Sequence, residues 1–538
     1  MTPTPSAPVS TRTRTRATWG RLAAALGSGL VAGLCFPPTN FGPLVLVALV
    51  PLLWAWRGAR PAHAALYGFA FGIGCYGITI AWIRYFGTVA VVPLVAAMAA
   101  AIAVVGLIVA LLARRGVASP LLTAAVWVLL EALRGRWPFG GFPWSDVGIA
   151  LHDVSAARAV ASVGGALLLS FLVVAFNGFV LDLVLAIVAR SRRSASSGRS
   201  ASAAASGRGR GRHAVVMAAG GLVGVLAIAF VADVTRFEPR VTGHLRVAML
   251  QPDDEELSLA GQTNQLLTDK SLALADRLQG RYDLIVFPES ALDTDPQTDP
   301  ALHARLAGIA AAHDSSLLVN ARTPGTDGQV RNTNLLYDPD GRLQGTYSKQ
   351  HLVPFGEYVP WRKELGFIRE LRQIPYDFQA GHRRQVFTVA GRPIGSVICF
   401  ESAFSPLVRD YVRDGAQAII VSTNNRSYRR SGNSEQHLAL SQMRAAETAR
   451  PVLQASVSGI SGVIDPDGHV HDTTQLFEST TTSTTIATTT GETLYVRFGD
   501  WIIVLSAVAV LGATVIAVVR ARRDATKDGA PTATTPAA

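Results

Sequence analysis

The chain has few cysteines, and their positions predict neither a disulfide-stabilised domain nor a metal-binding one. Three cysteines occur in 538 residues, and Cys399 is the single one in the polar part of the sequence, which excludes a disulfide framework there. Cys35 and Cys75 lie in apolar stretches, where a small buried side chain is the ordinary role of cysteine. No histidine–cysteine cluster has the spacing of metal ligands, so the sequence predicts no metal site.

Charged residues are also scarce, and their placement indicates a membrane protein. They make up 16% of the chain against 49% hydrophobic residues, and the mean hydropathy of +0.29 is unusual for a soluble enzyme of this length. The net charge of +11 comes largely from arginines beside apolar runs, as at 12–16 and 208–212. Aromatic and basic residues do not interleave as on a nucleic-acid platform, so we expect no nucleic-acid partner. The length predicts at least two structural units.

Eight apolar stretches predict transmembrane helices, seven before the polar region and one after it. Most of them approach the ~20 residues that a helix needs to cross the hydrocarbon core. They lie at 21–36, 42–56, 63–83, 89–113, 118–134, 163–189, 214–234 and 499–520. No small-residue cleavage site follows the first stretch, which favours a retained membrane anchor over a removed signal peptide.

Arginine and lysine are distributed unequally between alternate loops, which predicts the orientation. One set of loops holds Arg12, Arg14, Arg16, Arg21, Arg57, Arg60, Arg114, Arg115, the arginine-rich linker 190–212, Arg520, Arg522, Arg523 and Lys527. The short loops of the other set hold Arg84, Arg134, Arg136 and Arg158. Basic residues stay on the cytoplasmic side, so we expect both termini in the cytoplasm and the polar region outside.

The predicted organisation follows from these stretches. We expect a cytoplasmic tail at 1–20, a seven-helix membrane domain at 21–234, an extracytoplasmic domain at 243–493, an eighth helix at 499–520, and a disordered cytoplasmic tail at 521–538. The linker 191–212 has no apolar face and is expected to be disordered. The threonine-rich stretch 479–490 is expected to be a solvated loop.

The polar region alternates short apolar runs with amphipathic segments, which is typical of an α/β layered domain. Strands are predicted at 245–250, 284–287, 316–319, 333–337, 385–389, 394–398, 418–422 and 452–455, and helices at 259–279, 300–313, 403–413 and 434–449. Glu289 and Cys399 each follow one of these apolar runs, and Lys349 lies in the run 347–358. Ligands and chemistry collect at strand ends in such sheets. Taken singly, each residue has an ordinary explanation as a cap, a solvated charge or a core filler.

The three residues together, with their neighbours, resemble a known family. Phe-Pro-Glu-Ser at 287–290, Ser-Lys-Gln-His-Leu-Val-Pro-Phe-Gly-Glu-Tyr-Val-Pro at 348–360 and Ile-Cys-Phe-Glu-Ser at 398–402 resemble the Glu–Lys–Cys signature of the nitrilase superfamily. The extended run 351–360, the flanking spans and Trp-Pro-Phe-Gly-Gly-Phe-Pro-Trp at 137–144 resemble the apolipoprotein N-acyltransferase family over nearly the whole chain. The low-lysine, arginine- and alanine-rich composition suggests an actinobacterial member. The resemblance implies a multi-span helical membrane domain and an α/β nitrilase-like αββα sandwich.

The resemblance also implies roles for four residues. Cys399 would be the nucleophile and Glu289 the general base, because a thiol attacks an ester well only after losing its proton. Lys349 would stabilise the oxyanion of the tetrahedral intermediate. Glu357 would support the lysine or the base, although a structural salt bridge to Lys349 without chemical consequence is an alternative. No cofactor is implied.

The implied reaction transfers an acyl chain from a membrane phospholipid, through a thioester, to the N-terminal diacylglyceryl-cysteine of a lipoprotein. Substrate contacts are expected from Trp137, Trp144, Phe400, Glu401 and Tyr428, and the protein is expected to be a monomer embedded in the bacterial cell membrane. The loop 423–428 and Phe400 depart from the family pattern, which puts lipid preference rather than the triad in question. An ordinary aromatic belt is an alternative reading of the two tryptophans.

Two other functions are compatible with parts of the sequence. A membrane-tethered nitrilase-type amidase would use the same triad with water attacking the thioester. A non-catalytic scaffold for a polyprenol-phosphate glycosyltransferase would not need Glu289, Lys349 and Cys399 together. The extended run 351–360 and the eight predicted spans favour the acyltransferase, by analogy with the fold of that family.

Overall fold

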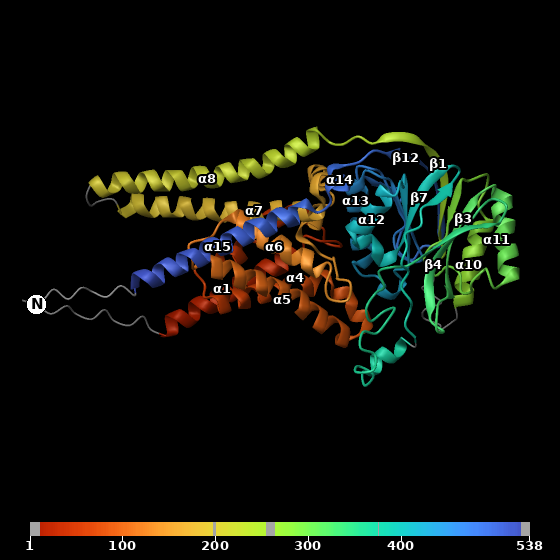
Figure 1. Ribbon diagram of the computed structural model, residues 1–538, viewed down its shortest axis with the longest axis horizontal. Coiled ribbons are helices and arrows are strands. Elements are labelled where there is room, and N and C mark those ends of the chain that lie inside the picture. Colours follow the sequence, from red (N-terminus) through yellow and green to blue (C-terminus); the bar gives the residue numbers. More distant parts are fainter. Residues whose placement is uncertain (1–10, 197–200, 254–263, 375, 529–538) are drawn as a thin grey trace, which may run out of the picture.

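The computed structural model describes residues 11–196, 201–253, 264–374 and 376–528. It divides into a helical part, made of the described residues between 11 and 234 and of 501–528, and an α/β part, made of the described residues between 240 and 490 (Figure 1). The helical part contains α1 (Thr11–Gly33), η1 (Gly42–Leu44), α2 (Val45–Ala48), α3 (Val50–Trp56), α4 (Pro61–Thr79), η2 (Ala81–Phe86), α5 (Thr88–Ala113), α6 (Pro120–Arg134), η3 (Val147–Leu151), α7 (Ser155–Ser196), α8 (Ala201–Val234) and α15 (Trp501–Asp528).

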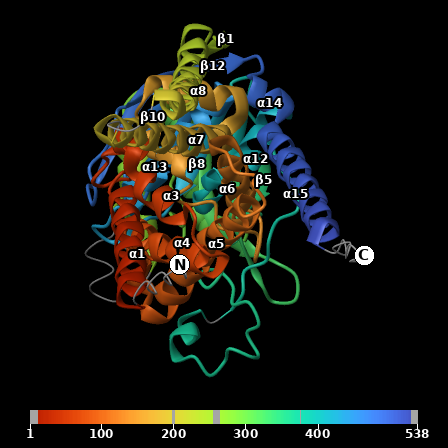
Figure 2. The same ribbon diagram turned by 90° about the vertical axis from the view of Figure 1, so that its left-hand side faces the viewer.

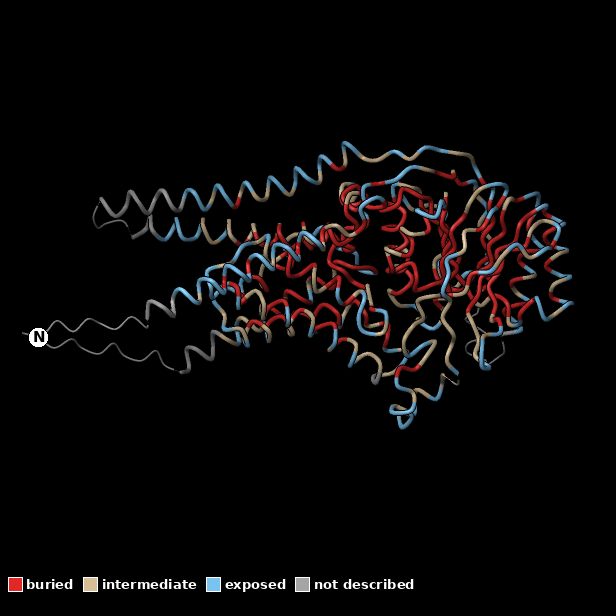
Figure 3. Tube along the Cα trace, in the orientation of Figure 1, coloured by how far each residue is buried: buried red, intermediate tan, exposed pale blue. Residues whose placement is uncertain are grey.

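Within the described residues, four helices are long and apolar enough to cross a membrane. They are Ala90–Ala113, Ser155–Arg192, Arg212–Val234 and Trp501–Arg523. The last two expose most of their side chains, which suits contact with lipid: α8 and α15 lie at the edge of the helical part (Figures 2 and 3). The predicted stretch 42–56 is not one continuous helix, because η1, α2 and α3 divide it, with proline near the start of η1 and of α3.

The linker and the C-terminal tail, both expected to be disordered, are partly helical, and so is the predicted N-terminal tail. α1 begins at Thr11 rather than at residue 21, and α15 continues to Asp528. α7 continues to Ser196 and α8 begins at Ala201, so most of the linker 191–212 is helix. Alanine and arginine are among the best helix formers and extend the adjacent helices. Residues 1–10, 197–200 and 529–538, where the remaining tail and linker predictions fall, lie outside the described residues.

Two six-stranded sheets form the centre of the α/β part. Their strand orders are β12-β1-β2-β3-β4-β5 and β11-β10-β9-β8-β7-β6. The strands are β1 (Arg240–Gln251), β2 (Leu284–Val286), β3 (Ser316–Pro324), β4 (Val330–Tyr337), β5 (Leu343–Ser348), β6 (Phe387–Val389), β7 (Arg392–Ile398), β8 (Ala418–Thr423), β9 (Val452–Ser456), β10 (Gly462–Ile464), β11 (Val470–His471) and β12 (Thr480–Thr490). β1–β3 run parallel, as do β7–β9, so each sheet gathers several carboxyl ends at one edge.

Helices cover the outer face of each sheet, which confirms the αββα sandwich. α10 (Asn264–Asp276) and α11 (Pro300–His313) lie on the first sheet, and α12 (Ser405–Arg413) and α13 (Asn433–Thr448) lie between the second sheet and the helical part (Figure 1). Strands covered on both faces carry apolar runs, and β2, β8 and β9 are buried along their whole length. The start of the predicted helix 259–279 falls partly outside the described residues.

The threonine-rich stretch 479–490 is a strand rather than the expected loop. β12 pairs antiparallel with β1 along nearly all of its length, from Thr480 opposite Gln251 to Thr490 opposite Arg240. Threonine is β-branched and suits a half-buried pleated surface, and this preference outweighs its polarity here. The pairing closes one edge of the first sheet just before the chain returns to the helical part through α14 (Leu494–Phe498).

Buried hydrogen bonds join α13 to the helical part. Gln436 accepts bonds from the indole N–H groups of Trp82 at 3.1 Å and Trp144 at 2.7 Å. Its amide nitrogen donates to the carbonyl oxygen of Pro37 at 2.8 Å. Farther along α13, Glu447 accepts from the backbone N–H of Ala166 at 2.8 Å. Because polar groups are costly to bury without partners, these bonds fix the second sheet relative to the helices.

Candidate active site

The three residues singled out by the sequence meet between the two sheets. Glu289 lies three residues after β2, Lys349 follows β5 directly, and Cys399 follows β7 directly. They are 6%, 1% and 9% exposed, respectively, so all three are buried. β2 and β5 belong to the first sheet and β7 to the second, and packing of the sheets brings their ends together.

Lys349 lies at the centre of a compact charged group. Its ammonium nitrogen is 3.2 Å from Oε1 of Glu289 and 2.9 Å from Oε1 of Glu357. The amide of Asn332, on β4, donates to the same two oxygens at 2.8 Å and 3.2 Å. The second oxygen of Glu357 accepts from the backbone N–H of Val353 at 2.8 Å. Asn332 and Lys349 thus each donate to both carboxylates and hold Glu289 and Glu357 in fixed positions beside the buried ammonium group.

The two carboxylate oxygens of Glu289 differ in their hydrogen bonds. Both hydrogen bonds from Lys349 and Asn332 reach its Oε1, and among the described residues its Oε2 has no hydrogen-bond partner. A carboxylate oxygen that accepts no other bond can receive a proton from a neighbouring thiol. Glu289 is therefore fixed through one oxygen and available through the other.

The backbone presents Cys399 at a sharp turn. Its φ of 53° lies in the left-handed region that a non-glycine residue rarely adopts, and the 3₁₀-helix η5 (Cys399–Ala403) begins there. The buried ring of His437, on α13, bonds through Nε2 to the carbonyl oxygen of Cys399 at 3.0 Å and to the hydroxyl of Ser402 at 2.8 Å. These contacts hold a conformation that would otherwise be unfavourable by ~1–3 kcal/mol.

Electrostatics couple the thiol to the acid and the cation. Burial, and after it the charge of Glu289, raise the pKa of Cys399 to about 12, although Lys349, Thr423 and the N–H of Asn424 oppose this rise. The thiol is therefore protonated at rest and needs a base. Burial lowers the pKa of Lys349, but the charges of Glu289 and Glu357 outweigh burial and hold that pKa well above its ordinary value. Lys349 therefore remains a cation beside the sulfur.

Glu401 links the loop that carries Lys349 to the turn at Cys399. It is fully buried and accepts bonds from the hydroxyl of Tyr347 at 2.8 Å, the N–H of Gln350 at 2.6 Å and the N–H of Ile398 at 2.8 Å. Burial raises the pKa of this carboxyl group, and the backbone N–H groups oppose the rise. Protein donors thus occupy both oxygens of Glu401, and they belong to residues adjacent in sequence to Lys349 and Cys399.

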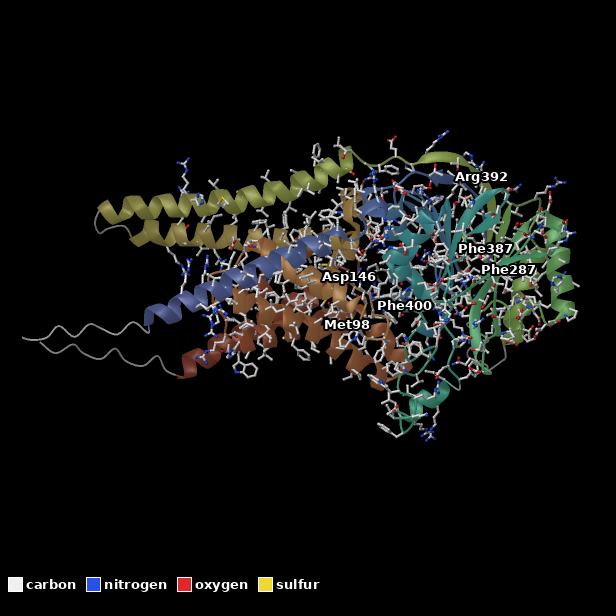
Figure 4. All side chains as sticks on the ribbon, in the orientation of Figure 1. Met98, Asp146, Phe287, Phe387, Arg392 and Phe400 are labelled. Atoms are coloured by element: carbon white, nitrogen blue, oxygen red, sulfur yellow. The ribbon has the colours of Figure 1, made fainter. Side chains whose placement is uncertain are left out.

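Of the other residues predicted to contact substrate, Trp144, Phe400 and Tyr428 belong to one cluster of rings, and Trp137 lies apart from it. We call this cluster, formed by Trp82, Phe142, Trp144, Phe400 and Tyr428, the aromatic wall. Phe400 lies at the junction between the helical and α/β parts (Figure 4), where its ring stacks on Phe142 at 5.7 Å and Trp144 at 6.3 Å. Tyr428 packs edge-on against Trp82 at 4.8 Å. Burial, and after it the charge of Cys399, raise the pKa of Tyr428. Trp137 is 67% exposed, and within the described residues no ring contact joins it to these side chains.

A cavity of about 360 Å³ adjoins this wall between α6, α7 and α13. His351 and Phe404 line it with their rings stacked at 4.0 Å, and Phe404 packs against Phe400 at 5.0 Å. Cys399 does not line it, so the cavity adjoins the site without containing the thiol. No group of three or more potential metal ligands is present in the described part of the chain.

Sequence reasoning missed the residues that orient the triad. Asn332 was included in no prediction, yet it bonds both acids of the site. Asn320, on β3, supports it by donating to its side-chain oxygen at 2.9 Å. His437 falls within the predicted helix 434–449 but was not singled out. The available signal was a polar side chain within an otherwise buried strand or helix face, which requires a partner.

Comparison with known proteins relates both parts of the chain to described families. Residues 28–179 match the family described as apolipoprotein N-acyltransferase N-terminal domain, and residues 246–495 match the carbon-nitrogen hydrolase family. The first match covers most of the helical part and the second contains Glu289, Lys349 and Cys399.

Curated relatives match the chain along nearly its whole length. The apolipoprotein N-acyltransferase of Gloeobacter violaceus is 32% identical over 91% of this chain and 92% of its own. Those of Methylococcus capsulatus and Geobacter metallireducens are 30% and 29% identical, covering 89% and 92% of this chain and 92% and 94% of their own. Among solved structures, an amidase from Nesterenkonia sp. aligns at 20% identity with a TM-score of 0.35, covering 49% of this chain and 95% of its own.

Proposed function

The chain belongs to the apolipoprotein N-acyltransferase family, and from this premise we propose how its own residues transfer an acyl chain to a lipoprotein. It is a bacterial membrane acyltransferase with phospholipid and lipoprotein substrates. The assignment of catalytic roles rests on one observation. The buried ammonium of Lys349 lies 3.2 Å from Glu289 and within electrostatic range of the Cys399 thiol.

In the first half-reaction, Cys399 takes the acyl chain from a phospholipid. Its sulfur attacks the ester carbonyl carbon while Oε2 of Glu289 takes the thiol proton. The ammonium of Lys349 stabilises the negative charge that develops on the carbonyl oxygen. The intermediate then collapses, the carbon–oxygen bond to the glycerol breaks, and Glu289 returns the proton to the leaving oxygen. A lysophospholipid leaves and a thioester remains.

In the second half-reaction, the α-amine of the diacylglyceryl-cysteine attacks the thioester carbonyl. Glu289 takes a proton from the attacking nitrogen, and Lys349 again stabilises the oxyanion. The carbon–sulfur bond breaks, the sulfur recovers the proton, and the product is an amide. Glu357 and Asn332 take no proton in this scheme, because they hold Lys349 and Glu289 in place.

The helical part keeps this chemistry at the membrane surface. Extracting a lipid chain into water costs ~0.8 kcal/mol per methylene group, so a thiol held beside the bilayer avoids a large penalty. We propose eight spans, cytoplasmic termini and an extracytoplasmic α/β part, supported by the arginine asymmetry between alternate loops. We also propose that one chain suffices, since all the site residues described come from a single polypeptide.

The decisive experiment replaces the nucleophile in full-length protein reconstituted in phospholipid vesicles. With a synthetic diacylglyceryl-cysteine peptide as acceptor, mass spectrometry should detect the N-acyl peptide and lysophospholipid for wild type. Cys399→Ala should form neither product while remaining membrane-inserted. Cys35→Ala, which removes a buried thiol in the helical part, is the matched control and should remain active.

Three results would contradict the proposal. Full transfer by Cys399→Ala would remove the nucleophile from the mechanism. Release of free fatty acid without amide in the presence of acceptor would indicate an amidase instead. A wild-type protein that yields neither product would leave a non-catalytic role.

A further inference from the structure

The arginines on the loops beside the α/β part differ in their partners. Arg134 forms an ion pair with Asp146, and Arg136 lies 2.7 Å from Asp500. Arg158 donates to the backbone carbonyl oxygens of Asp467 and His152 at 2.9 Å and 3.1 Å. All three side chains therefore have protein partners, and that of Arg158 joins the helical part to the α/β part.

Arg84, on η2, is the exception in this group. It is exposed, and within the described residues it has no carboxylate partner; its contacts are with the neighbouring Tyr85. Arginine is disfavoured on the outer side of a membrane protein. An outer arginine without a protein partner is therefore a candidate for binding an external anion.

A second arginine meets Arg84 on the same aromatic ring. The guanidinium carbon of Arg84 lies 5.2 Å from the centre of the Tyr85 ring, and that of Arg429, from the loop after β8, lies 5.5 Å from it. Arg429 is also exposed and has no carboxylate partner in the described part of the chain. One half-buried tyrosine thus holds two cations from different parts of the protein, through cation–π contacts.

This arginine pair lies at the outer end of the aromatic wall that reaches the nucleophile. Trp82, two residues before Arg84, packs on Tyr428, which directly precedes Arg429. Phe86 packs on the same tyrosine at 5.5 Å. Trp82 also packs edge-on against Trp144 at 5.3 Å, and Trp144 stacks with Phe400, the residue after Cys399. Aromatic side chains of this kind settle at the headgroup level of a bilayer.

We propose that Arg84 and Arg429, held on Tyr85, bind the phosphodiester of the phospholipid acyl donor and favour donors with an anionic headgroup. This inference rests on the proposed function. Guanidinium groups are weakly hydrated, fork-shaped donors that match phosphate oxygens. The aromatic wall would then receive the apolar region of the lipid between its phosphate and the ester under attack.

The charge of the pair distinguishes the two substrates. The acceptor presents an α-ammonium, which two arginines repel, whereas every phospholipid donor presents a phosphate. Among donors, phosphatidylethanolamine adds an ammonium close to its phosphate, and phosphatidylglycerol adds hydroxyl groups without charge. The pair should therefore favour phosphatidylglycerol and act in the first half-reaction.

A competition assay tests the inference with the full-length protein. Vesicles would contain equal amounts of phosphatidylglycerol and phosphatidylethanolamine carrying different isotopic labels in the same acyl chain, with a diacylglyceryl-cysteine peptide as acceptor. The label ratio in the amide product gives the ratio of kcat/KM for the two donors. Wild type should favour the phosphatidylglycerol label. Arg84→Gln and Arg429→Gln should each lower kcat/KM for phosphatidylglycerol by about tenfold, as expected for one charge-assisted hydrogen bond, and move the ratio toward one.

Two further measurements separate binding from folding. Arg281→Gln removes an arginine that is 83% exposed and paired with Asp314 at 3.6 Å, and should leave the ratio unchanged. The rate at which acceptor discharges a preformed thioester should be the same in wild type, Arg84→Gln and Arg429→Gln. Arg84→Lys should recover part of the preference.

The outcomes distinguish this inference from the proposed function. The inference would be overturned if both glutamine variants gave the same label ratio as wild type. It would also be overturned if acceptor discharged the thioester more slowly in these variants than in wild type, because the pair would then act on the acceptor. Absence of any amide product from wild type with either donor would instead overturn the proposed function.

Discussion

Removing the positive charge of Lys349 should both inactivate and destabilise the protein. The side chain is 1% exposed and lies within 3.2 Å of two carboxylates, so Lys349→Met leaves Glu289 and Glu357 buried without their cation. Breaking a buried ion pair from one side costs ~3–5 kcal/mol. Loss of one oxyanion-stabilising group lowers kcat by ~10²–10³. We therefore expect a lower melting temperature and nearly complete loss of N-acylation.

A second substitution separates these two effects. Lys349→Met with Glu357→Gln removes one of the stranded charges, so part of the lost stability should return while the activity stays low. Thermal unfolding followed by tryptophan fluorescence in detergent, and the rate of N-acylation in vesicles, give the two readouts. Lys270→Met removes a lysine whose described contact is one backbone carbonyl, and is the matched control. Activity near wild type in Lys349→Met, or recovery of activity in the double variant, would refute the role of Lys349 at the oxyanion.

Three further outcomes are expected. Burial lowers the pKa of His437 to about 4, so the folded state takes up this proton at a lower pH than the unfolded chain does. The melting temperature should therefore fall as the pH is lowered from about 6.5 to 4. A fall as steep in His437→Gln would contradict this. Glu401→Gln replaces an acceptor with a donor facing the N–H groups of Gln350 and Ile398, so kcat should fall ~10-fold with an unchanged KM for the phospholipid donor, and a change confined to KM would indicate substrate contact instead. An alkaline phosphatase fused after Thr493 should be active only if that position is extracytoplasmic, so inactivity of a stably produced fusion would reverse the proposed orientation.

Local patterns in the sequence predicted much of the α/β part. The amphipathic stretch 300–313 has the same bounds as α11, because Asp299 caps its first turn through the N–H of Leu302 and a left-handed Asp314 ends it. Strands β2, β7, β8 and β9 fall on the predicted apolar runs. Glu289 and Cys399 could be singled out because both follow such runs.

Features that depend on distant partners escaped prediction. β12 consists almost wholly of threonine, alanine and serine, and becomes a strand because β1, more than 200 residues earlier in the chain, offers an unpaired edge. The role of Glu401 is defined by donors at Tyr347, Gln350 and Ile398, and no local pattern indicates that these groups face one carboxylate. Such partners are fixed by the packing of the two sheets.

The central claim is that Cys399 carries the acyl chain between the two substrates, and it can be measured directly. Wild-type protein in phospholipid vesicles without acceptor would be quenched in acid and digested, and the peptide containing Cys399 would be weighed by mass spectrometry. The mechanism predicts a mass increase equal to one acyl group, lost on addition of the diacylglyceryl-cysteine peptide and absent in Glu289→Gln. A thiol that stays unmodified while the same preparation forms amide product with acceptor would contradict it.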